Sequence, residues 1–358
     1  MSDVAVELRD VSKNYGGYVA LDRFSHSVRK GEFVVLLGPS GSGKTTLLSI
    51  LGGFTTPSTG TVLIGDRDVT AMLPASRPTA TVFQDYALFP HMTVRDNVAF
   101  GLAMRRIPKP HRFELAARAL AVVGLDGFGG RRIHQLSGGQ RQRVALARAI
   151  VIEPEVLLLD EPLGALDVKI RRQMQDELLH LQRKLGSTFI HVTHDQEEAM
   201  SIADTIVLLN HGRIEDVGAP ERIYQQPASV FAASFMGETN LFEGKVTESR
   251  GGELVVETPA GRIIARGSAP PGAKVHISIR PENIRLGAQT EGTFGLGRAK
   301  LRDVIFQGTH RRCRAELEGK DAVALLLYLR PEAGELGDVA SDLWVRPQDI
   351  ALIHGEPA

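Results

Sequence analysis

Two glycine-rich segments of the chain contain the residue types that hold phosphate groups. The first reads Gly38-Pro39-Ser40-Gly41-Ser42-Gly43-Lys44-Thr45 and fits the pattern G-x-x-x-x-G-K-S/T, between an apolar strand-like run and a helical run that starts at Thr46. Its glycines let backbone N–H groups wrap phosphates, Lys44 can neutralise the β- and γ-phosphates, and the Thr45 hydroxyl can bind Mg²⁺. The alternative, a glycine-rich turn with a solvated lysine, is disfavoured by this context.

The second segment is Leu136-Ser137-Gly138-Gly139-Gln140, which precedes a helix-like run over 141–150. Its backbone N–H groups and the positive end of that helix can hold an anion. Phosphate loops are common in proteins, but a phosphate loop together with this pentapeptide in one chain is not. The chain is therefore predicted to carry two phosphate-binding segments.

Two carboxylates end another strand-like run, Val156-Leu157-Leu158-Leu159-Asp160-Glu161. Burial of these carboxylates would cost free energy unless a charged group or water contacted them at the end of the strand. We assign Asp160 to the orientation of Mg²⁺. Glu161, on the other side of the strand, is assigned as the general base that accepts a proton from the attacking water. The alternative is a pair of N-cap residues for a helix that begins near Pro162.

Polar residues also follow other strand-like runs. His194 follows one at its carboxyl end, where open α/β sheets bind ligands, and it could hold the γ-phosphate and the attacking water. Asp195 with Glu198 resembles a capping box, and His191 is interpreted as a satisfied core histidine. Gln84 could contact Mg²⁺ or water and couple the nucleotide state to the segment that follows it; a surface glutamine is the alternative.

Two tyrosines are candidates for contact with a nucleotide base. Tyr15 could stack on an adenine ring, and Tyr18 is the competing candidate. A turn aromatic that covers the core is the alternative for Tyr15.

The elements that position these residues form an α/β pattern up to about residue 232. Continuous apolar runs predict strands buried on both faces at 33–37, 156–159, 188–192 and 205–209. Strand signals disappear between about Val94 and Ile150, so a helical subdomain is expected there. The domain boundary is placed near Met236, which gives domains over 1–236 and 237–358.

The tail after this boundary is expected to be a small β domain. Glycine and proline are frequent, and 275–279 alternates as a strand does. Arg280-Pro281-Glu282-Asn283-Ile284 recurs as Arg346-Pro347-Gln348-Asp349-Ile350. Two related β units would explain the recurrence, and a chance match of short motifs is the alternative.

Composition narrows the class of protein. The 358 residues include 42 Lys and Arg against 42 Asp and Glu, so a protein that mainly binds nucleic acid or an anionic membrane is disfavoured. A single cysteine, Cys313, and an N-terminal segment without a signal-peptide pattern suggest a reducing, cytoplasmic compartment. Because no apolar run approaches the roughly 20 residues of a membrane span, any membrane role is expected to require a partner chain.

The order and spacing of these features resemble those of the ATP-binding-cassette (ABC) ATPases. The features are Tyr15, the phosphate loop, Gln84, 136–140, Asp160-Glu161, Leu166-Asp167 and His194. The resemblance covers about 235 residues. It implies an α/β phosphate-loop NTPase fold, RecA-like, with a mostly parallel sheet, a β subdomain and a helical insert. It also implies ATP, Mg²⁺ and a head-to-tail homodimer. In such a dimer Ser137, Gly139 and Gln140 would contact the γ-phosphate and ribose held by the partner, and Gly164-Ala165-Leu166-Asp167 would line the seam.

The tail resembles the transport-associated (TOBE) β domain, OB-like, of bacterial importers, and 234–240 and 279–284 look most like the polyamine and ferric-ion branches. This implies spermidine or putrescine import, with ferric iron, sugar or another small solute as alternatives. The implied partners are integral-membrane permease subunits and a periplasmic or lipid-anchored solute-binding protein, without nucleic acid. The implied place is the cytoplasmic face of the inner membrane.

Two residues depart from the family pattern: Ile133, where many relatives carry proline, and Gly164, where many carry serine. Three other functions are alternatives to this importer function. They are a soluble cassette acting on DNA or ribosomes, disfavoured by the absence of a heptad run and of a second cassette; an exporter cassette; and a regulatory role of the tail.

Overall fold

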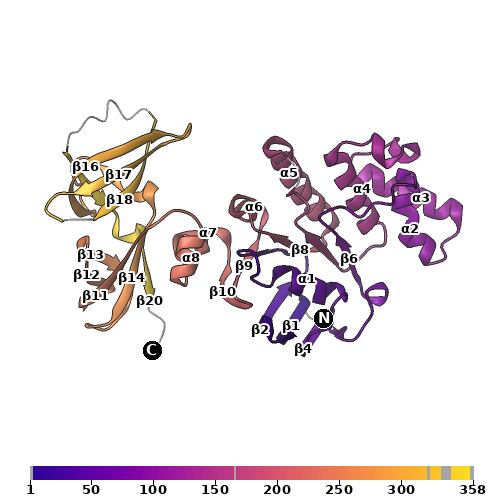
Figure 1. Ribbon diagram of the computed structural model, residues 1–358, viewed down its shortest axis with the longest axis horizontal. Helices are drawn as coiled ribbons and strands as arrows, with labels where there is room; N and C mark the ends of the chain where they lie inside the picture. Colours follow the sequence, from indigo (N-terminus) through magenta and orange to yellow (C-terminus); the bar gives the residue numbers. More distant parts are fainter. Residues whose placement is uncertain (1–2, 165–166, 321–322, 332–339, 355–358) are drawn as a thin grey trace. The chain divides into compact units, whose positions relative to one another are not determined.

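The computed structural model describes residues 3–164, 167–320, 323–331 and 340–354. It divides into two compact units, Met1–Pro220 and Glu221–Ala358 (Figure 1). Each unit has a hydrophobic core of its own. The expected combination of an α/β cassette and a small all-β domain is confirmed.

A six-stranded sheet forms the centre of the first unit. Its strands, in sheet order, are β10 (Arg213–Gly218), β9 (Thr205–Asn210), β3 (Phe33–Leu37), β8 (Thr188–Thr193), β7 (Val156–Asp160) and β6 (Thr79–Val82). All neighbours are parallel except β10, which runs antiparallel to β9 at the edge. The four apolar runs predicted as buried strands are β3, β7, β8 and β9. Every residue of β3 and β8 is buried, as expected of strands that are covered on both faces of the sheet.

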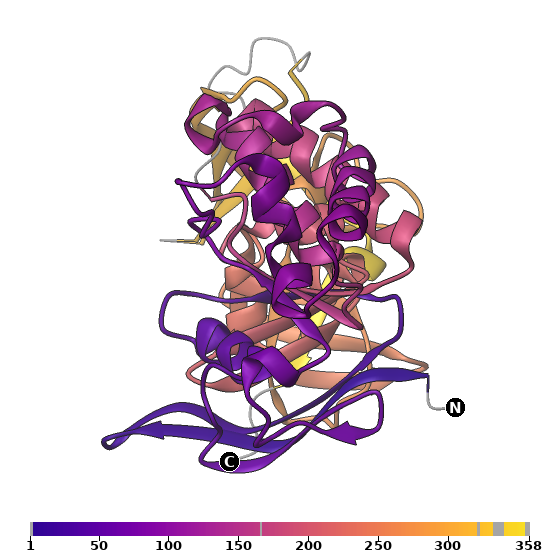
Figure 2. The same cartoon turned by 90° about the vertical axis from the view of Figure 1, so that its right-hand side faces the viewer.

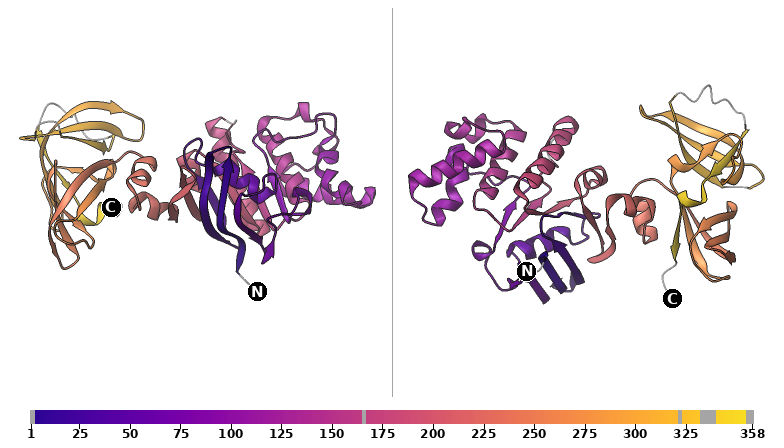
Figure 3. Two further views of the ribbon diagram at one scale, coloured as in Figure 1. Left: turned by 60° about the horizontal axis from the view of Figure 1, so that its bottom comes forward. Right: turned by 180° about the vertical axis from the view of Figure 1, so that it is seen from behind.

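Helices surround this sheet and form the expected insert. Three belong to the nucleotide-binding core: α1 (Lys44–Gly52), α5 (Val168–Leu185) and α6 (Gln196–Ile202). The insert contains α2 (Val94–Met104), α3 (Lys109–Val122) and α4 (Gly138–Ile150), which pack against one another and lie beyond β6 (Figures 1 and 3). None of the helices in the described part of the chain is long and apolar enough to cross a membrane.

An antiparallel sheet at the N-terminus supplies the β subdomain that the family resemblance implied. Its order is β2 (Tyr18–Arg29), β1 (Val4–Tyr15), β4 (Thr59–Ile64) and β5 (Arg67–Asp68). Figure 2 and the left view of Figure 3 show the long indigo strands β1 and β2 side by side. Their apolar face packs on the same core as α1 and the six-stranded sheet.

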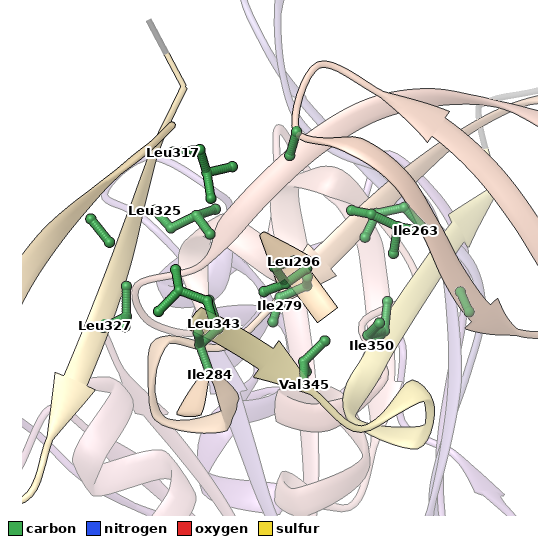
Figure 4. Close-up of a cluster of buried hydrophobic side chains, with 14 of the residues drawn as sticks. Ile263, Ile279, Ile284, Leu296, Leu317, Leu325, Leu327, Leu343, Val345 and Ile350 are labelled. Carbon is green, nitrogen blue, oxygen red and sulfur yellow. The ribbon is translucent and has the colours of Figure 1, made fainter. Parts of the chain in front are cut away.

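Two antiparallel sheets form the body of the second unit. One has the order β13 (Gly261–Arg266), β12 (Glu253–Thr258), β11 (Asn240–Arg250), β14 (Lys274–Ile279) and β20 (Ile350–His354). The other has the order β15 (Arg285–Leu286), β19 (Ala340–Val345), β16 (Phe294–Phe306), β17 (Arg311–Leu317) and β18 (Ala324–Leu329). Side chains from both sheets, including Ile263, Ile279, Leu325 and Leu343, meet in one core (Figure 4).

The short helices α7 (Pro220–Gln225) and α8 (Val230–Phe235) lie almost entirely in the second unit, whereas the sequence placed the boundary after them, near Met236. The buried guanidinium of Arg280 explains the difference. It donates hydrogen bonds to the carbonyl oxygens of Tyr224, Ala233, Gly237 and Glu238 at 2.9–3.2 Å. One side chain of the β domain thereby holds both helices.

The recurring Arg-Pro motif forms the same backbone turn twice. Short 3₁₀ turns at Pro281–Asn283 and Pro347–Asp349 each lead into a strand, β15 and β20. The arginines differ: Arg280 is buried, whereas the half-exposed Arg346 pairs with Asp349 at 2.6 Å. The two copies therefore share a turn but not the role of the arginine.

Candidate functional site

The phosphate loop joins the carboxyl end of β3 to α1, as its sequence context predicted. Gly38 has a φ of +153°, and a β-carbon there would lie 2.2 Å from the carbonyl oxygen of Leu209. Gly43 has a φ of +103°, and a β-carbon there would lie 2.5 Å from the carbonyl oxygen of Ala20. Both positions therefore require glycine, because the loop passes directly against the neighbouring backbone.

The N-terminus of α1 lacks a capping side chain. Its N-cap is Gly43, which has none, and the helix begins at Lys44, two residues before the expected start at Thr46. The first N–H groups of a helix and its dipole together attract anions. A cleft of about 300 Å³ lies at this end and is lined by Tyr18, Ala20, the loop residues 40–46 and Glu161.

Lys44 is the buried cation of this cleft and is only 6% exposed. Its Nζ donates hydrogen bonds to the carbonyl oxygens of Gly38 at 2.7 Å and Pro39 at 2.8 Å. Burial lowers the pKa of the ammonium group, and the negative charges of Glu161 and Asp160 oppose this shift. A phosphate that replaced the two carbonyl groups as acceptor would gain a charge-assisted hydrogen bond.

The predicted carboxylates lie at the carboxyl end of β7. Burial and the neighbouring charge of Glu161 raise the pKa of Asp160, while His191 and Lys44 act in the opposite direction. Glu161 has a φ of +42°, an uncommon conformation for a residue with a side chain and one that concentrates at functional sites. The alternative that this pair caps a helix is wrong for the described residues, because the helix that follows has Asp167 as its N-cap.

His194 and Glu161 come together from neighbouring strands. His194 Nδ1 lies 3.2 Å from Glu161 Oε1; the histidine side chain is 62% exposed and the glutamate 23%. This places an imidazole beside the carboxylate assigned as general base, at the strand ends where the phosphate loop also lies. His191 is fully buried, as expected of a core histidine, and its Nε2 lies 2.9 Å from Glu198 Oε1.

Gln84 follows β6 and is exposed. A β-carbon built at Gly164 would lie 3.9 Å from Gln84 Nε2 and 4.0 Å from Glu161 Oε2, so both side chains end near this glycine. Gly164 has space for the serine that many relatives carry, since these are ordinary contact distances. The space at this position therefore does not itself require glycine.

Of the two tyrosine candidates, Tyr18 lies beside the phosphate loop. Its hydroxyl donates to the carbonyl oxygen of Gly41 at 3.1 Å, and its ring lines the loop's cleft. Tyr15 is 48% exposed, and the ammonium group of Lys13 lies over its ring at 4.9 Å. The two tyrosines face each other across the β1–β2 turn, so their order in the sequence could not separate them.

The second segment predicted to bind phosphate contains the start of α4, which begins at Gly138, three residues before the helical run expected over 141–150. Ser137 is the N-cap, and its Oγ accepts a hydrogen bond from the backbone N–H of Gln140 at 3.3 Å. In return the Gln140 side-chain oxygen accepts from the backbone N–H of Ser137 at 3.0 Å, which completes a capping box. Because the serine oxygen acts as an acceptor in this cap, its hydroxyl group can still donate a hydrogen bond to a phosphate.

Asp167 belongs to the same region as this segment. Its side chain caps α5 by accepting from the backbone N–H of Ile170 at 3.1 Å. A cleft of about 560 Å³ is lined by Ser137, Gly138, Gly139, Gln140, Arg143, Asp167, Ile170, Gln173 and Met174. We call this cleft the signature cleft. The neighbouring seam residues Ala165 and Leu166 lie outside the described residues.

A hydrogen-bonded network behind His194 was only partly expected from the sequence. Asp195 is the N-cap of α6 as predicted, but the Glu198 carboxylate accepts from Thr193 Oγ1 at 2.6 Å and contacts His191, instead of completing a capping box. Burial alone would raise the pKa of Glu198, yet His191, Thr193 and Arg171 hold it below its ordinary value. Arg171, which the sequence analysis missed, pairs with Asp195 at 2.9 Å. Its position one helical turn after Asp167 was the signal from which its place near the site could have been predicted.

Comparison with known proteins matches both units. A family model described as ABC transporter matches residues 21–164, and a TOBE domain model matches residues 277–353. The spermidine/putrescine import ATP-binding protein of Marinobacter nauticus is 49% identical over 290 residues, covering 80% of this chain and 78% of that protein. The protein of the same name from Nitratidesulfovibrio vulgaris is 47% identical over 365 residues, covering 99% of both chains.

Solved structures agree for the cassette. The cbiO1 protein of Clostridium perfringens, part of the ABC transporter complex cbiONQ, has a TM-score of 0.58 and 30% identity over 62% of this chain and 91% of that one. The ATP-binding cassette MJ0796, in a dimeric post-hydrolysis state with ADP and Pi, has a TM-score of 0.53 and 33% identity, covering 60% and 98%. The chain thus belongs to the ABC transporter family, as an ATP-hydrolysing subunit of the import type with a C-terminal TOBE domain.

Proposed function

We propose that this ATPase drives the import of polyamines such as spermidine and putrescine through separate integral-membrane subunits. The observation that carries the proposal is the similarity, at 41% to 50% identity, to proteins named spermidine/putrescine import ATP-binding protein. Several of these matches cover nearly all of both chains. Ferric iron, sugars and other small solutes are the alternative cargoes.

In this proposal two copies associate head to tail, and each ATP is held between the phosphate loop of one copy and the signature cleft of the other. Two features support the arrangement. The phosphate-loop cleft and the signature cleft lie at the N-termini of different helices, α1 and α4. Their linings share no residue among those described, so each copy offers two separate half-sites. The γ-phosphate would then stabilise the closed dimer, and its loss would release it.

Thr45, Gln84 and Asp160 are proposed to hold Mg²⁺. They offer hydroxyl, amide and carboxylate oxygens, the ligand type that Mg²⁺ prefers, and Mg²⁺ usually takes few protein ligands beside water and phosphates. Bound there, Mg²⁺ would neutralise charge on the β- and γ-phosphates.

The hydrolytic roles follow from the contacts around Glu161. Its carboxylate would accept a proton from the water that attacks the γ-phosphate, and His194, 3.2 Å away, would hold that water and the γ-phosphate in line. Lys44 and the α1 N–H groups would bind the phosphates in one copy. Ser137 of the partner copy's signature cleft would donate a hydrogen bond from its hydroxyl group to the γ-phosphate.

The proposed place of action is the cytoplasmic face of the inner membrane, with the helical insert α2–α4 in contact with the permease subunits. A solute-binding protein outside the membrane would deliver the polyamine. In this arrangement the insert would pass the closing and opening of the dimer to the membrane subunits, while the cargo would be recognised by the other chains.

The test is uptake of radiolabelled spermidine and putrescine in a strain that lacks this chain but keeps its partner subunits. Re-expression of the parental chain should restore uptake, and Glu161→Gln, which should fold and bind ATP, should not. Ferric iron and maltose uptake, measured in the same cells, should be unaffected. If the parental chain restored only the uptake of iron or of sugar, the polyamine assignment would be wrong; if it restored none of them, while the purified chain hydrolysed ATP, another role would be indicated.

A further inference from the structure

The turn that carries His194 is held from two sides. On its inner side, Thr193 Oγ1 accepts from the backbone N–H of Asp195 at 3.0 Å and donates to Glu198, which also contacts His191. These three inner residues, His191, Thr193 and Glu198, are at most 4% exposed. The inner attachment is therefore part of the core.

On its outer side, the turn is attached to α5 by an ion pair. Arg171 Nη1 donates to Asp195 Oδ2 at 2.9 Å, while Asp195 Oδ1 caps α6 by accepting from the backbone N–H of Glu198 at 3.1 Å. One carboxylate thus shares its oxygens between α6 and α5. His194, whose Nδ1 lies beside Glu161, directly precedes it.

The other end of this attachment is the first turn of α5. The backbone N–H of Arg171 donates to the carbonyl oxygen of Asp167 at 2.8 Å, and the Asp167 side chain caps the same turn. Asp167 and Ile170 line the signature cleft. The ion pair therefore connects the turn beside the signature cleft with the turn that presents His194, within one chain.

We propose that Arg171 and Asp195 are positioning residues, whose ion pair holds His194 against Glu161 in the catalytic site of their own chain. The inference rests on the proposed roles of Glu161 and His194. It adds two residues to the hydrolytic machinery, neither of which touches the nucleotide. In a dimer it also places the α5 turn beside one ATP site in direct contact with Asp195, the residue that follows the histidine of the other site.

Stability is not what such a pair is expected to supply. Both side chains are more than a quarter exposed, at 28% and 27%, and ion pairs of this exposure contribute little to folding. A purely structural pair would therefore leave turnover almost unchanged. A positioning pair should lower kcat and leave nucleotide affinity intact, since a small misplacement of a catalytic group can cost about 10- to 100-fold in rate.

The test is a double-variant cycle on the full chain. Asp195→Asn keeps an oxygen to cap α6 but removes the charge, and Arg171→Gln removes the cation. Each should lower kcat about tenfold, leave the ATP dissociation constant within about twofold, and leave the thermal unfolding midpoint almost unchanged. The double variant should be no slower than either single variant, because both lose the same contact.

Two further variants complete this cycle. Arg171→Lys, which can still pair with Asp195, should recover most of the lost rate. Arg9→Gln breaks the ion pair between Arg9 and Glu7 within β1, two residues that line neither cleft, and should keep the parental kcat. Multiplicative losses in the double variant, or no recovery with lysine, would overturn the proposal.

Mixed dimers assign the effect to one site. When the partner copy carries Glu161→Gln, only the site of the first copy is active. Arg171→Gln in the first copy should then lower the remaining activity about tenfold, whereas Arg171→Gln in the partner should not. The opposite pattern would show that Arg171 acts through the signature cleft and would overturn the proposal. If instead Glu161→Gln retained parental turnover, the proposed roles of Glu161 would fail, although the double-variant cycle would still report on the ion pair.

Discussion

The two glycine-rich segments proposed to bind phosphate both lie at helix N-termini, yet the surroundings of those N-termini differ. At α1 the N-cap is a glycine without a side chain, and a buried lysine lies behind the loop. At α4 the N-cap Ser137 and Gln140 satisfy each other in a capping box, and the cation in the cleft lining, Arg143, is paired with Glu177. In the proposed function, the first segment binds phosphate with residues of its own copy. The second donates a hydrogen bond from the Ser137 hydroxyl to a phosphate that the partner copy presents.

The largest expected effect concerns Glu161, which lines the cleft of the first segment. Glu161→Gln should lower ATP turnover about 100- to 10,000-fold, because a general base is removed while the shape of the site is kept. ATP binding should persist, and the protein should accumulate as an ATP-bound dimer. Phosphate release and size-exclusion chromatography with ATP would measure both. Glu155→Gln, at the opposite end of the same strand, is the matched control and should retain parental turnover. Parental turnover in Glu161→Gln would exclude Glu161 as the base.

The next effect separates the two segments. Ser137→Arg fills the signature cleft and removes its hydroxyl donor, so turnover should fall about 100-fold, as when one transition-state donor is lost. Nucleotide binding to the phosphate loop of the monomer should remain, as measured by equilibrium titration. Thr93→Ala removes an equivalent N-cap, that of α2, and should cost stability but little turnover. Normal hydrolysis by Ser137→Arg would contradict a composite site.

Glycine is required in one segment more than in the other. Gly43→Ala would place a β-carbon 2.5 Å from the Ala20 carbonyl oxygen at a φ of +103°, and should lower the free energy of unfolding by about 1–3 kcal/mol. Gly139→Ala would place its β-carbon at ordinary contact distances, 3.6 Å from Ile170 and 3.9 Å from Met174, and should change the free energy of unfolding by less than about 1 kcal/mol, since alanine suits a helix better than glycine. Urea unfolding of the two variants gives the comparison. Equal destabilisation would mean that the α4 segment is packed as tightly as the phosphate loop.

The parts of the fold that could be predicted are those whose pattern is local. Continuous apolar runs identified the buried parallel strands, and the phosphate loop was placed correctly between β3 and α1. The long strands β1 and β2 were not identified individually, because bulges near Asp10 and Arg23, both with positive φ, shift their register and break the alternation of period two. The contacts of Arg280 and Arg171 join segments far apart in sequence, so neither the extent of the second unit nor the support of His194 could be read from spacing.

The smallest expected effect defines the edge of the first segment. Tyr18→Ala should weaken ATP binding about tenfold, since Tyr18 both lines the phosphate-loop cleft and donates to Gly41, and loss of one aromatic–base stack costs about 1–3 kcal/mol. Tyr15→Ala should change the ATP dissociation constant less than about twofold. Tyr18→Phe keeps the ring and removes the hydrogen bond: affinity close to the parental value would assign the effect to stacking, and a loss equal to that of Tyr18→Ala would assign it to the loop contact. If Tyr15→Ala weakened binding more than Tyr18→Ala, the base would lie on the Tyr15 side of the β1–β2 turn. The nucleotide site would then extend further from the phosphate loop than the cleft indicates.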